Sequence, residues 1–120
     1  MHELGIAQSI LDLAAEQVPA GQLADVRSIR IRVGDLAGVV VDSLEFCFDA
    51  IIAGTPLGRA RLEVERVPAV CRCGHCAAEF ALGGSPVFAC RACGGTDVAL
   101  LAGRELQVVH VELADTEAAV

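Results

Sequence analysis

Two Cys-x-x-Cys pairs are the residues of this 120-residue chain whose spacing is most typical of metal chemistry. They are Cys73/Cys76 and Cys90/Cys93, and residues 77–89 separate them. Each pair can turn both thiolates toward one point, and the intervening segment is long enough for the two pairs to meet. Four thiolates in a tetrahedral arrangement suit zinc and leave no open coordination position for catalysis. The spacing therefore predicts a structural zinc site closed by these four cysteines.

Several alternatives to this ligand set stay open at the level of sequence. Cys71 and His75 flank or interrupt the first pair, so either side chain could replace one of the four cysteines, although the ordinary interpretation is that both lie outside the ligand shell. Iron also accepts four thiolates, as in a rubredoxin-like centre. Two disulfides or four free thiols are the alternatives without a metal. Gly94 and Gly95, after the second pair, favour a tight backbone turn beneath a metal ion.

The first three residues form a second potential metal site. The Met1 amine, the His2 amide nitrogen and the His2 imidazole can close adjacent chelate rings on one cation. Nitrogen donors in a tetragonal arrangement suit Ni(II) or Cu(II), and Glu3 could add an amide or a carboxylate. We expect Met1 to be retained, because removal of the initiator requires a small second residue. Taken alone, a histidine at position 2 is usually only an exposed polar residue.

The composition excludes several functional classes. The net charge is -7 and all nine basic residues are arginine, which disfavours nucleic acid because such a partner normally meets a basic patch. No segment resembles a signal peptide or approaches membrane-spanning length. We therefore expect a cytoplasmic protein without membrane contact, whose reduced cysteines favour metal over disulfides. No phosphate-binding glycine loop and no pairing of a nucleophile with a base is visible, so we do not expect an enzyme.

Hydrophobic periodicity predicts two helices and three strands around the cysteine pairs. Residues 4–18 have helical spacing, residues 29–33 alternate as a half-buried strand, and residues 42–45 (Asp-Ser-Leu-Glu) resemble the capping box of a second helix. Residues 62–65 and 105–113 have strand character. The apolar positions expected to line the buried helix faces are Leu4, Ala7, Ile10, Leu11, Ala14 and Val18 in the first helix and Leu44, Cys47, Phe48 and Ile51 in the second.

These elements predict an α+β fold. It consists of a small three-stranded sheet with two helices, plus an inserted zinc-ribbon-like module with two Cys-x-x-Cys knuckles. Residues 1–68 and 104–120 would form the α/β domain, and residues 69–103 the zinc-binding domain that interrupts it between the second and third strands. The glutamates of the second strand could pair with Arg30 and Arg32 of the first, although the ordinary interpretation of these charges is a solvated sheet face.

Four further segments stand in a fixed order around the cysteine pairs. They are residues 1–7 (Met-His-Glu-Leu-Gly-Ile-Ala), 32–39 (Arg-Val-Gly-Asp-Leu-Ala-Gly-Val), 54–57 (Gly-Thr-Pro-Leu) and 103–108 (Gly-Arg-Glu-Leu-Gln-Val). In that order the chain resembles the HypA/HybF family of hydrogenase nickel-incorporation proteins over nearly its whole length, apart from the acidic tail. The Met-His-Glu-Leu start combined with two Cys-x-x-Cys pairs is specific. The main departure from the family pattern is Cys71, an additional thiol beside the cysteine cage.

The resemblance implies a nickel metallochaperone that delivers Ni(II) during maturation of nickel–iron hydrogenase and, in some members, of urease. In that family the nickel site uses the N-terminal histidine, here His2, with neighbouring nitrogens from Met1 and with Glu3 beside it. The four paired cysteines hold a structural zinc. Implied partners are the nickel-handling GTPase HypB and the hydrogenase large-subunit precursor, and the sequence leaves monomer and homodimer open. The rival interpretation is a zinc-ribbon adaptor that binds protein without a nickel role.

Overall fold

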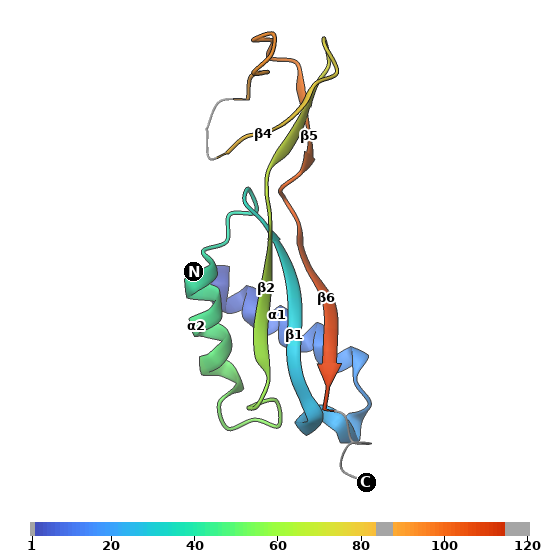
Figure 1. Cartoon of the computed structure of the whole chain (residues 1–120). Coiled ribbons are helices and arrows are strands. Elements are labelled where there is room, and N and C mark those ends of the chain that lie inside the picture. Colours follow the sequence, from blue (N-terminus) through green and yellow to red (C-terminus); the bar gives the residue numbers. More distant parts are fainter. Residues whose placement is uncertain (1, 84–87, 115–120) are drawn as a thin grey trace. The chain divides into compact units, whose positions relative to one another are not determined.

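The computed structural model describes residues 2–83 and 88–114, and of His2 and Ala20 it describes the backbone only. Its elements form two three-stranded sheets, one in the order β2-β1-β6 and the other in the order β4-β3-β5 (Figure 1). Two helices beside small sheets confirm the predicted α+β class. No helix in the described part of the chain is long and apolar enough to cross a membrane. The elements are α1 (His2–Gln17), η1 (Ala20–Asp25), β1 (Val26–Gly34), α2 (Val41–Ile52), β2 (Arg61–Val67), β3 (Val70–Cys73), β4 (Glu79–Ala81), β5 (Val98–Ala102) and β6 (Leu106–Leu113).

The chain divides into two compact units, and each is described by itself. The helical unit consists of Met1–Arg32, Val39–Glu65 and Gln107–Val120, and the cysteine unit consists of Val33–Gly38 and Arg66–Leu106. Both helices and most of β1, β2 and β6 therefore belong to the helical unit, while β3, β4 and β5 belong to the cysteine unit. The domain borders expected after residues 68 and 103 stay a prediction.

Helix α1 buries one apolar face, but its first turn differs from the expected pattern. Leu4 is 54% exposed, whereas Glu3 is only 7% exposed. The prediction that Leu4 opens the buried face was therefore wrong. Glu3 takes that position because it lies four residues before Ala7, and its carboxylate finds a backbone partner there, the N–H of Val40. The buried apolar residues are Ala7, Ile10, Leu11, Ala14 and, just after the helix, Val18.

Helix α2 begins without a side-chain cap. Its N-cap residue is Val40, which makes no side-chain cap hydrogen bond, so the capping box predicted at residues 42–45 was wrong. Asp42 already lies in the first turn, where its negative charge still suits the positive end of the helix dipole. Gly54 has a left-handed conformation, with φ of 77°, just beyond the end of the helix. Leu44, Phe48 and Ile52 are buried, whereas Cys47 and Ile51 are half-buried.

Strands β1 and β2 run parallel, with α2 as the crossover between them. Arg30 lies 3.6 Å from Glu63, and Arg32 lies 3.0 Å from Glu65, so residue numbers rise together along the two strands. These contacts are the pairing of glutamates with arginines that the sequence had left open. Parallel neighbours need a long connection, which is why a helix can be placed there.

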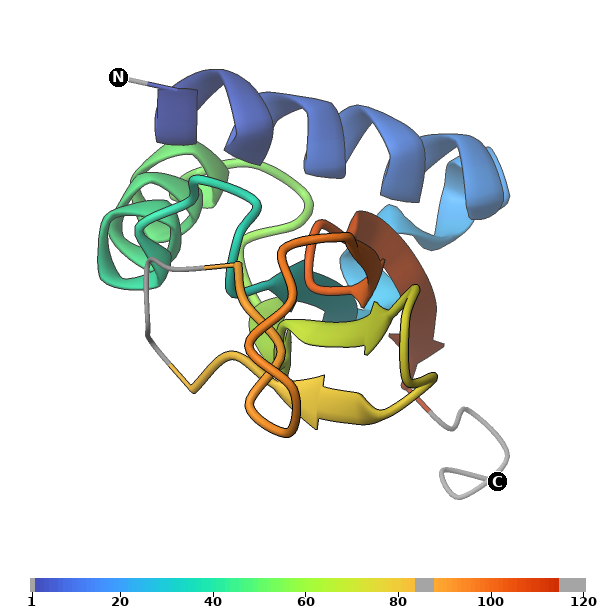
Figure 2. The same ribbon diagram turned by 90° about the horizontal axis from the view of Figure 1, so that it is seen from above.

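Strand β6 runs antiparallel to β1 on its other side. The N–H of Ala114 donates to the carbonyl of Asp25, and the Ser28 hydroxyl donates to the Glu112 carboxylate at 3.2 Å, so the numbers move in opposite directions. The figures agree that α1 crosses one face of the β2-β1-β6 sheet and that α2 lies beside the N-terminal end of α1 (Figures 1 and 2). Within the helical unit, the start of α1 is therefore supported by α2 (Figures 1 and 2).

The cysteine unit is built on a second sheet that the sequence did not predict in detail. Strand β3 pairs antiparallel with β4 and with β5. Its strands are only three to five residues long. Its apolar cluster is small and consists of buried Ala69, Cys71 and Leu82, against which Phe80, Val98 and Leu100 pack.

Two glycines give opposite predictions for stability. Gly5 lies inside α1 and a Cβ there would meet nothing within 4 Å, so Gly5→Ala should raise the free energy of unfolding by about 1 kcal/mol. At Gly34 a Cβ would overlap the backbone carbonyl of Gly103, so Gly34→Ala should lower the same quantity by about 1–3 kcal/mol. Urea unfolding of the metal-loaded proteins measures both. A neutral Gly34→Ala would mean that the two backbones do not approach this closely.

Candidate metal centre

The four paired cysteines come together at one point of the cysteine unit. The Sγ atoms of Cys73, Cys76, Cys90 and Cys93 all lie within 4.8 Å of one another. The Cys73–Cys93 sulfurs are 3.6 Å apart and the Cys76–Cys90 sulfurs 3.5 Å apart, and no cysteine of the chain is in a disulfide. Around a tetrahedral zinc with Zn–S bonds of about 2.3 Å, sulfurs would be about 3.8 Å apart. The donor set and its spacing therefore fit a tetrathiolate metal ion such as zinc.

The two Cys-x-x-Cys segments fold as the same turn. In each, the backbone N–H two residues after the first cysteine points at that cysteine's sulfur: His75 to Cys73 at 3.3 Å, and Ala92 to Cys90 at 3.4 Å. In each segment, the backbone carbonyl of the first cysteine accepts a hydrogen bond from the N–H of the residue four positions later. The backbone N–H of the same cysteine donates to the carbonyl of the residue five positions later. This repeated turn directs both sulfurs of each pair toward the point where the four Sγ atoms meet.

The residue after each pair has a left-handed backbone. Gly94, after the second pair, has φ of 76°, as its glycine had suggested, and Ala77, at the matching position of the first pair, has φ of 62°. Among the described residues Ala77 is the only one other than glycine with positive φ. The Cβ of an alanine makes this conformation cost about 1–2 kcal/mol. Comparing the two pairs position by position would have revealed this strained residue in the sequence.

Backbone N–H groups stabilise two of the four thiolates. The pKa of the Cys73 thiol is lowered, first by the N–H of Cys76 and then by that of His75. The pKa of the Cys90 thiol is lowered to about 6, mainly by the N–H of Cys93, against the opposing effect of burial. The first cysteine of each pair is thus prepared to act as an anionic ligand before a metal arrives.

The second cysteine of each pair keeps its proton in the absence of a metal. The Gly95 N–H lowers the pKa of Cys93, but the hydrogen bonds that its thiol makes to Cys73 and Cys90 outweigh this and raise the pKa to about 11. The pKa of Cys76 is raised as well: the Ala78 N–H lowers it, but the other thiols and burial outweigh that effect. Four adjacent sulfurs cannot all ionise without a cation, so metal uptake must release protons and tighten as the pH rises.

Strand pairing brings the two knuckles to the same end of the sheet. Cys73 ends β3 and pairs with Val98, which begins β5. The residues just beyond this pair are also hydrogen-bonded: the N–H of Gly74 donates to the carbonyl of Asp97 at 2.6 Å. The chain therefore enters the first knuckle from β3 and leaves the second knuckle into β5.

The two secondary ligand candidates lie in different surroundings. Cys71 is fully buried in the apolar cluster with Ala69 and Leu82. His75 is exposed within the first knuckle, and its ring lies beside Gly95. The metal-ligand group formed by the described residues contains neither of them. That either residue acts as a ligand stays a prediction.

Of the N-terminal candidates, Met1 lies outside the described residues, and the backbone of His2 opens α1. Glu3 is buried, and its Oε2 accepts a hydrogen bond from the Val40 N–H at 3.1 Å. This N–H, followed by that of Glu3 itself, lowers the pKa of the Glu3 carboxyl to about 2. Glu3 therefore carries a negative charge at neutral pH and joins the start of α1 to the start of α2.

Comparison with known proteins gives one consistent family. The family model described as hydrogenase/urease nickel incorporation, metallochaperone, HypA matches residues 1–113. The chain is 49% identical to the hydrogenase maturation factor HypA of Streptomyces avermitilis over 96% of its own length and 88% of that protein's. The identity to the corresponding factor of Desulfosudis oleivorans is 44%, over 94% and 98% of the two chains.

Solved structures show the same fold. The solution structure of the Ni metallochaperone HypA from Helicobacter pylori superposes with a TM-score of 0.62, at 16% identity and over 93% of this chain and 97% of that one. A second solution structure of a HypA protein gives a TM-score of 0.66 at 18% identity, over 94% and 96% of the two chains.

The matched turns allow a paired test of backbone strain. Ala77→Gly should raise the free energy of unfolding of the zinc-loaded protein by about 1 kcal/mol, because glycine adopts positive φ without a Cβ clash. Gly94→Ala should lower it by a similar amount at the equivalent position of the second turn. Denaturant unfolding monitored in the cysteine unit measures both changes. Destabilisation by Ala77→Gly would show that Ala77 is not strained.

Proposed function

Because the chain belongs to the HypA family of hydrogenase/urease nickel-incorporation metallochaperones, we propose that it binds Ni(II) at its first residues and delivers it during maturation of nickel–iron hydrogenase. The family description is that of a metallochaperone and not of an enzyme, as the sequence had indicated. The observation that carries the proposal is the start of α1 at His2. This start leaves the backbone nitrogens beside the terminal amine outside the helical hydrogen-bond ladder.

The first four N–H groups of an α-helix have no carbonyl partner within the helix. The amides of His2 and Glu3 are among these groups in α1. Either amide can lose its proton to a metal ion without breaking a helical hydrogen bond. Together with the Met1 amine and the His2 imidazole, they would supply the tetragonal nitrogen set that suits Ni(II).

The charge at this end of α1 explains why the ligands must be anionic. The start of a helix carries a partial positive charge, which opposes a bare cation. Deprotonated amides offset that charge, and the buried Glu3 carboxylate adds another negative group close by. We propose that Glu3 contributes to the nickel site through its backbone nitrogen and through this charge, while its hydrogen bond to Val40 keeps the helix start in place.

The four-cysteine site would hold a resident zinc ion rather than the nickel cargo. Cys73, Cys76, Cys90 and Cys93 close the coordination shell, so an ion held there has no open position from which to leave toward a partner. A closed thiolate cage is suited to stability and an exposed terminal site is suited to release. Structural zinc binding of this kind supplies about 10–16 kcal/mol of apparent binding free energy.

Delivery requires a protein partner, and the surface beside Glu3 is suited to one. Leu4 and Phe46 are 54% and 75% exposed and line one pocket together with Glu3. Exposed apolar side chains of this size are typical of interaction sites. We propose that the nickel-handling GTPase HypB and the hydrogenase large-subunit precursor dock here in the cytoplasm, so that the cargo is desolvated at the moment of transfer.

The zinc assignment predicts that substitutions of the paired cysteines lower the zinc content and that substitutions of the other two cysteines do not. Cys73→Ala or Cys90→Ala should lose zinc and unfold the cysteine unit, because metal binding supplies its folding free energy. Cys71→Ala should keep a full equivalent of zinc and only lower the thermal midpoint, since Cys71 lies in the apolar cluster. Cys47→Ala in α2 is the control. Zinc content by elemental analysis decides the matter, and an empty site in Cys71→Ala with a full site in Cys73→Ala would overturn the ligand assignment.

The nickel assignment predicts that His2, one of the three histidines of the chain, is required for nickel binding. His2→Ala should abolish stoichiometric nickel binding in a calorimetric titration while leaving the zinc content unchanged. His110→Ala is the matched control, because His110 is exposed on β6 and should bind nickel like the wild type. The apparent nickel affinity should rise with pH, since binding displaces protons from the amine and the amides.

A chain extended by one residue before Met1 completes this test. The extension moves the amine out of the first chelate ring and puts an amide in its place, so nickel binding should weaken although every side chain is retained. Equal affinity of the wild type, His2→Ala and the extended chain would refute the terminal site and leave the zinc assignment untouched.

A further inference from the structure

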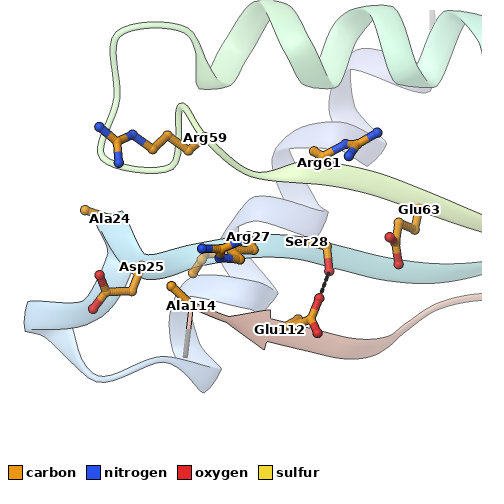
Figure 3. A pocket seen from close by; sticks show the side chains of 10 residues that line it. Ala24, Asp25, Arg27, Ser28, Arg59, Arg61, Glu63, Glu112 and Ala114 are labelled. Carbon is orange, nitrogen blue, oxygen red and sulfur yellow. Dashed lines mark hydrogen bonds between the residues drawn. The ribbon is translucent and has the colours of Figure 1, made fainter. Parts of the chain in front are cut away.

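Three arginines line one pocket of the helical unit that the nickel proposal does not use. The pocket has a volume of about 390 Å³ and lies where β1 and β2 begin and β6 ends (Figure 3). Arg27 comes from β1, Arg59 from the turn before β2 and Arg61 from the first position of β2. All three side chains are exposed. Guanidinium groups from three segments are thus presented at one opening.

Among the residues that the structure describes, these arginines differ from most others by having no side-chain partner. Within residues 2–83 and 88–114, Arg27, Arg59 and Arg61 form neither an ion pair nor a side-chain hydrogen bond. The chain has 16 acidic residues and a net charge of -7, so carboxylates are plentiful elsewhere. The arginines that do have partners are Arg30, Arg32, Arg66 and Arg72, which form ion pairs, and Arg91, which donates to the Leu82 carbonyl.

The arrangement of the three cations fits an extended ligand better than a compact one. Figure 3 shows the head groups of Arg59 and Arg61 pointing away from each other, with Arg27 on the neighbouring strand. An extended peptide places the carboxylates of alternate residues about 6.6 Å apart, so it can reach cations that point in different directions. Asp25, Glu63 and Glu112 line the same pocket, and their charge disfavours a compact dianion such as phosphate.

We propose that this pocket binds an extended acidic segment of a protein partner, with Arg27, Arg59 and Arg61 receiving its carboxylates. Arginine is the residue best suited to this task, because its planar guanidinium can hold a carboxylate through two parallel hydrogen bonds. The acidic remainder of the protein repels such a segment. The pocket therefore fixes the orientation of the partner and speeds association more than it adds affinity. This recognition does not depend on the nickel site.

The test uses a short fluorescein-labelled peptide in which glutamate alternates with serine, and fluorescence anisotropy as the readout. The triple variant Arg27→Gln, Arg59→Gln and Arg61→Gln should weaken binding about tenfold, and each single variant about twofold. Arg104→Gln is the matched control. It removes the same charge from another arginine that has no partner among the described residues and does not line the pocket, so it should bind the peptide like the wild type. Added salt should weaken binding to the wild type more than to the triple variant.

Three results would overturn the proposal. One is equal peptide affinity of the wild type and the triple variant, with thermal unfolding showing that both are folded. Another is an equal loss in Arg104→Gln and in the single pocket variants, which would mean that only net charge matters. The third is binding of inorganic phosphate at lower concentration than the peptide, which would make the pocket a site for small anions. Peptide binding that is unchanged in His2→Ala would separate this site from the nickel site.

Discussion

We propose that the cysteine unit depends on a metal ion, because its apolar cluster is small. Among the described residues, Ala69, Cys71 and Leu82 are the buried members of its apolar cluster, and its strands are three to five residues long. Small units of this kind usually need a metal or disulfides for stability. The two repeated turns bring four sulfurs together, two of them already inclined to ionise, so a divalent cation has a prepared site there. In our account, this metal remains bound for as long as the unit is folded.

In our proposal the cysteine site stays occupied and cannot also release a cargo, so the cargo requires a different donor chemistry. We propose that the start of α1 provides it, because backbone nitrogens at a helix start have no helical partner. The hydrogen bond from Val40 to the Glu3 carboxylate anchors this start on the second helix. The helix start at Glu3 is therefore held by packed structure. In our proposal, thiolate ligands select zinc and nitrogen ligands select nickel.

Local patterns predicted much of this protein, and non-local contacts account for what they missed. The cysteine spacing predicted the four clustered thiols, and strand alternation predicted the three strands of one sheet but not their order. Ligand spacing and side-chain alternation are properties of short segments. Leu4 was expected to be buried, but Glu3 is buried instead. The sequence pattern missed this because the hydrogen-bond partner of Glu3 is the backbone N–H of residue 40, which is distant in the sequence. The hydrogen bond between Val40 and Glu3 also lies at the start of α2, where a capping box had been predicted instead. The arginine pocket is also non-local, because the parallel pairing of β1 and β2 brings its residues together. The strain at Ala77, by contrast, was visible in the sequence by comparison with Gly94.

The division of the two metals by donor type is the central claim, and X-ray absorption at the zinc and nickel edges of the doubly loaded protein tests it most directly. Our account predicts a zinc ion with four sulfur neighbours at about 2.3 Å. It also predicts a nickel ion with nitrogen or oxygen neighbours only, in a tetragonal arrangement. Sulfur in the nickel shell, or zinc coordinated mainly by nitrogen, would contradict it.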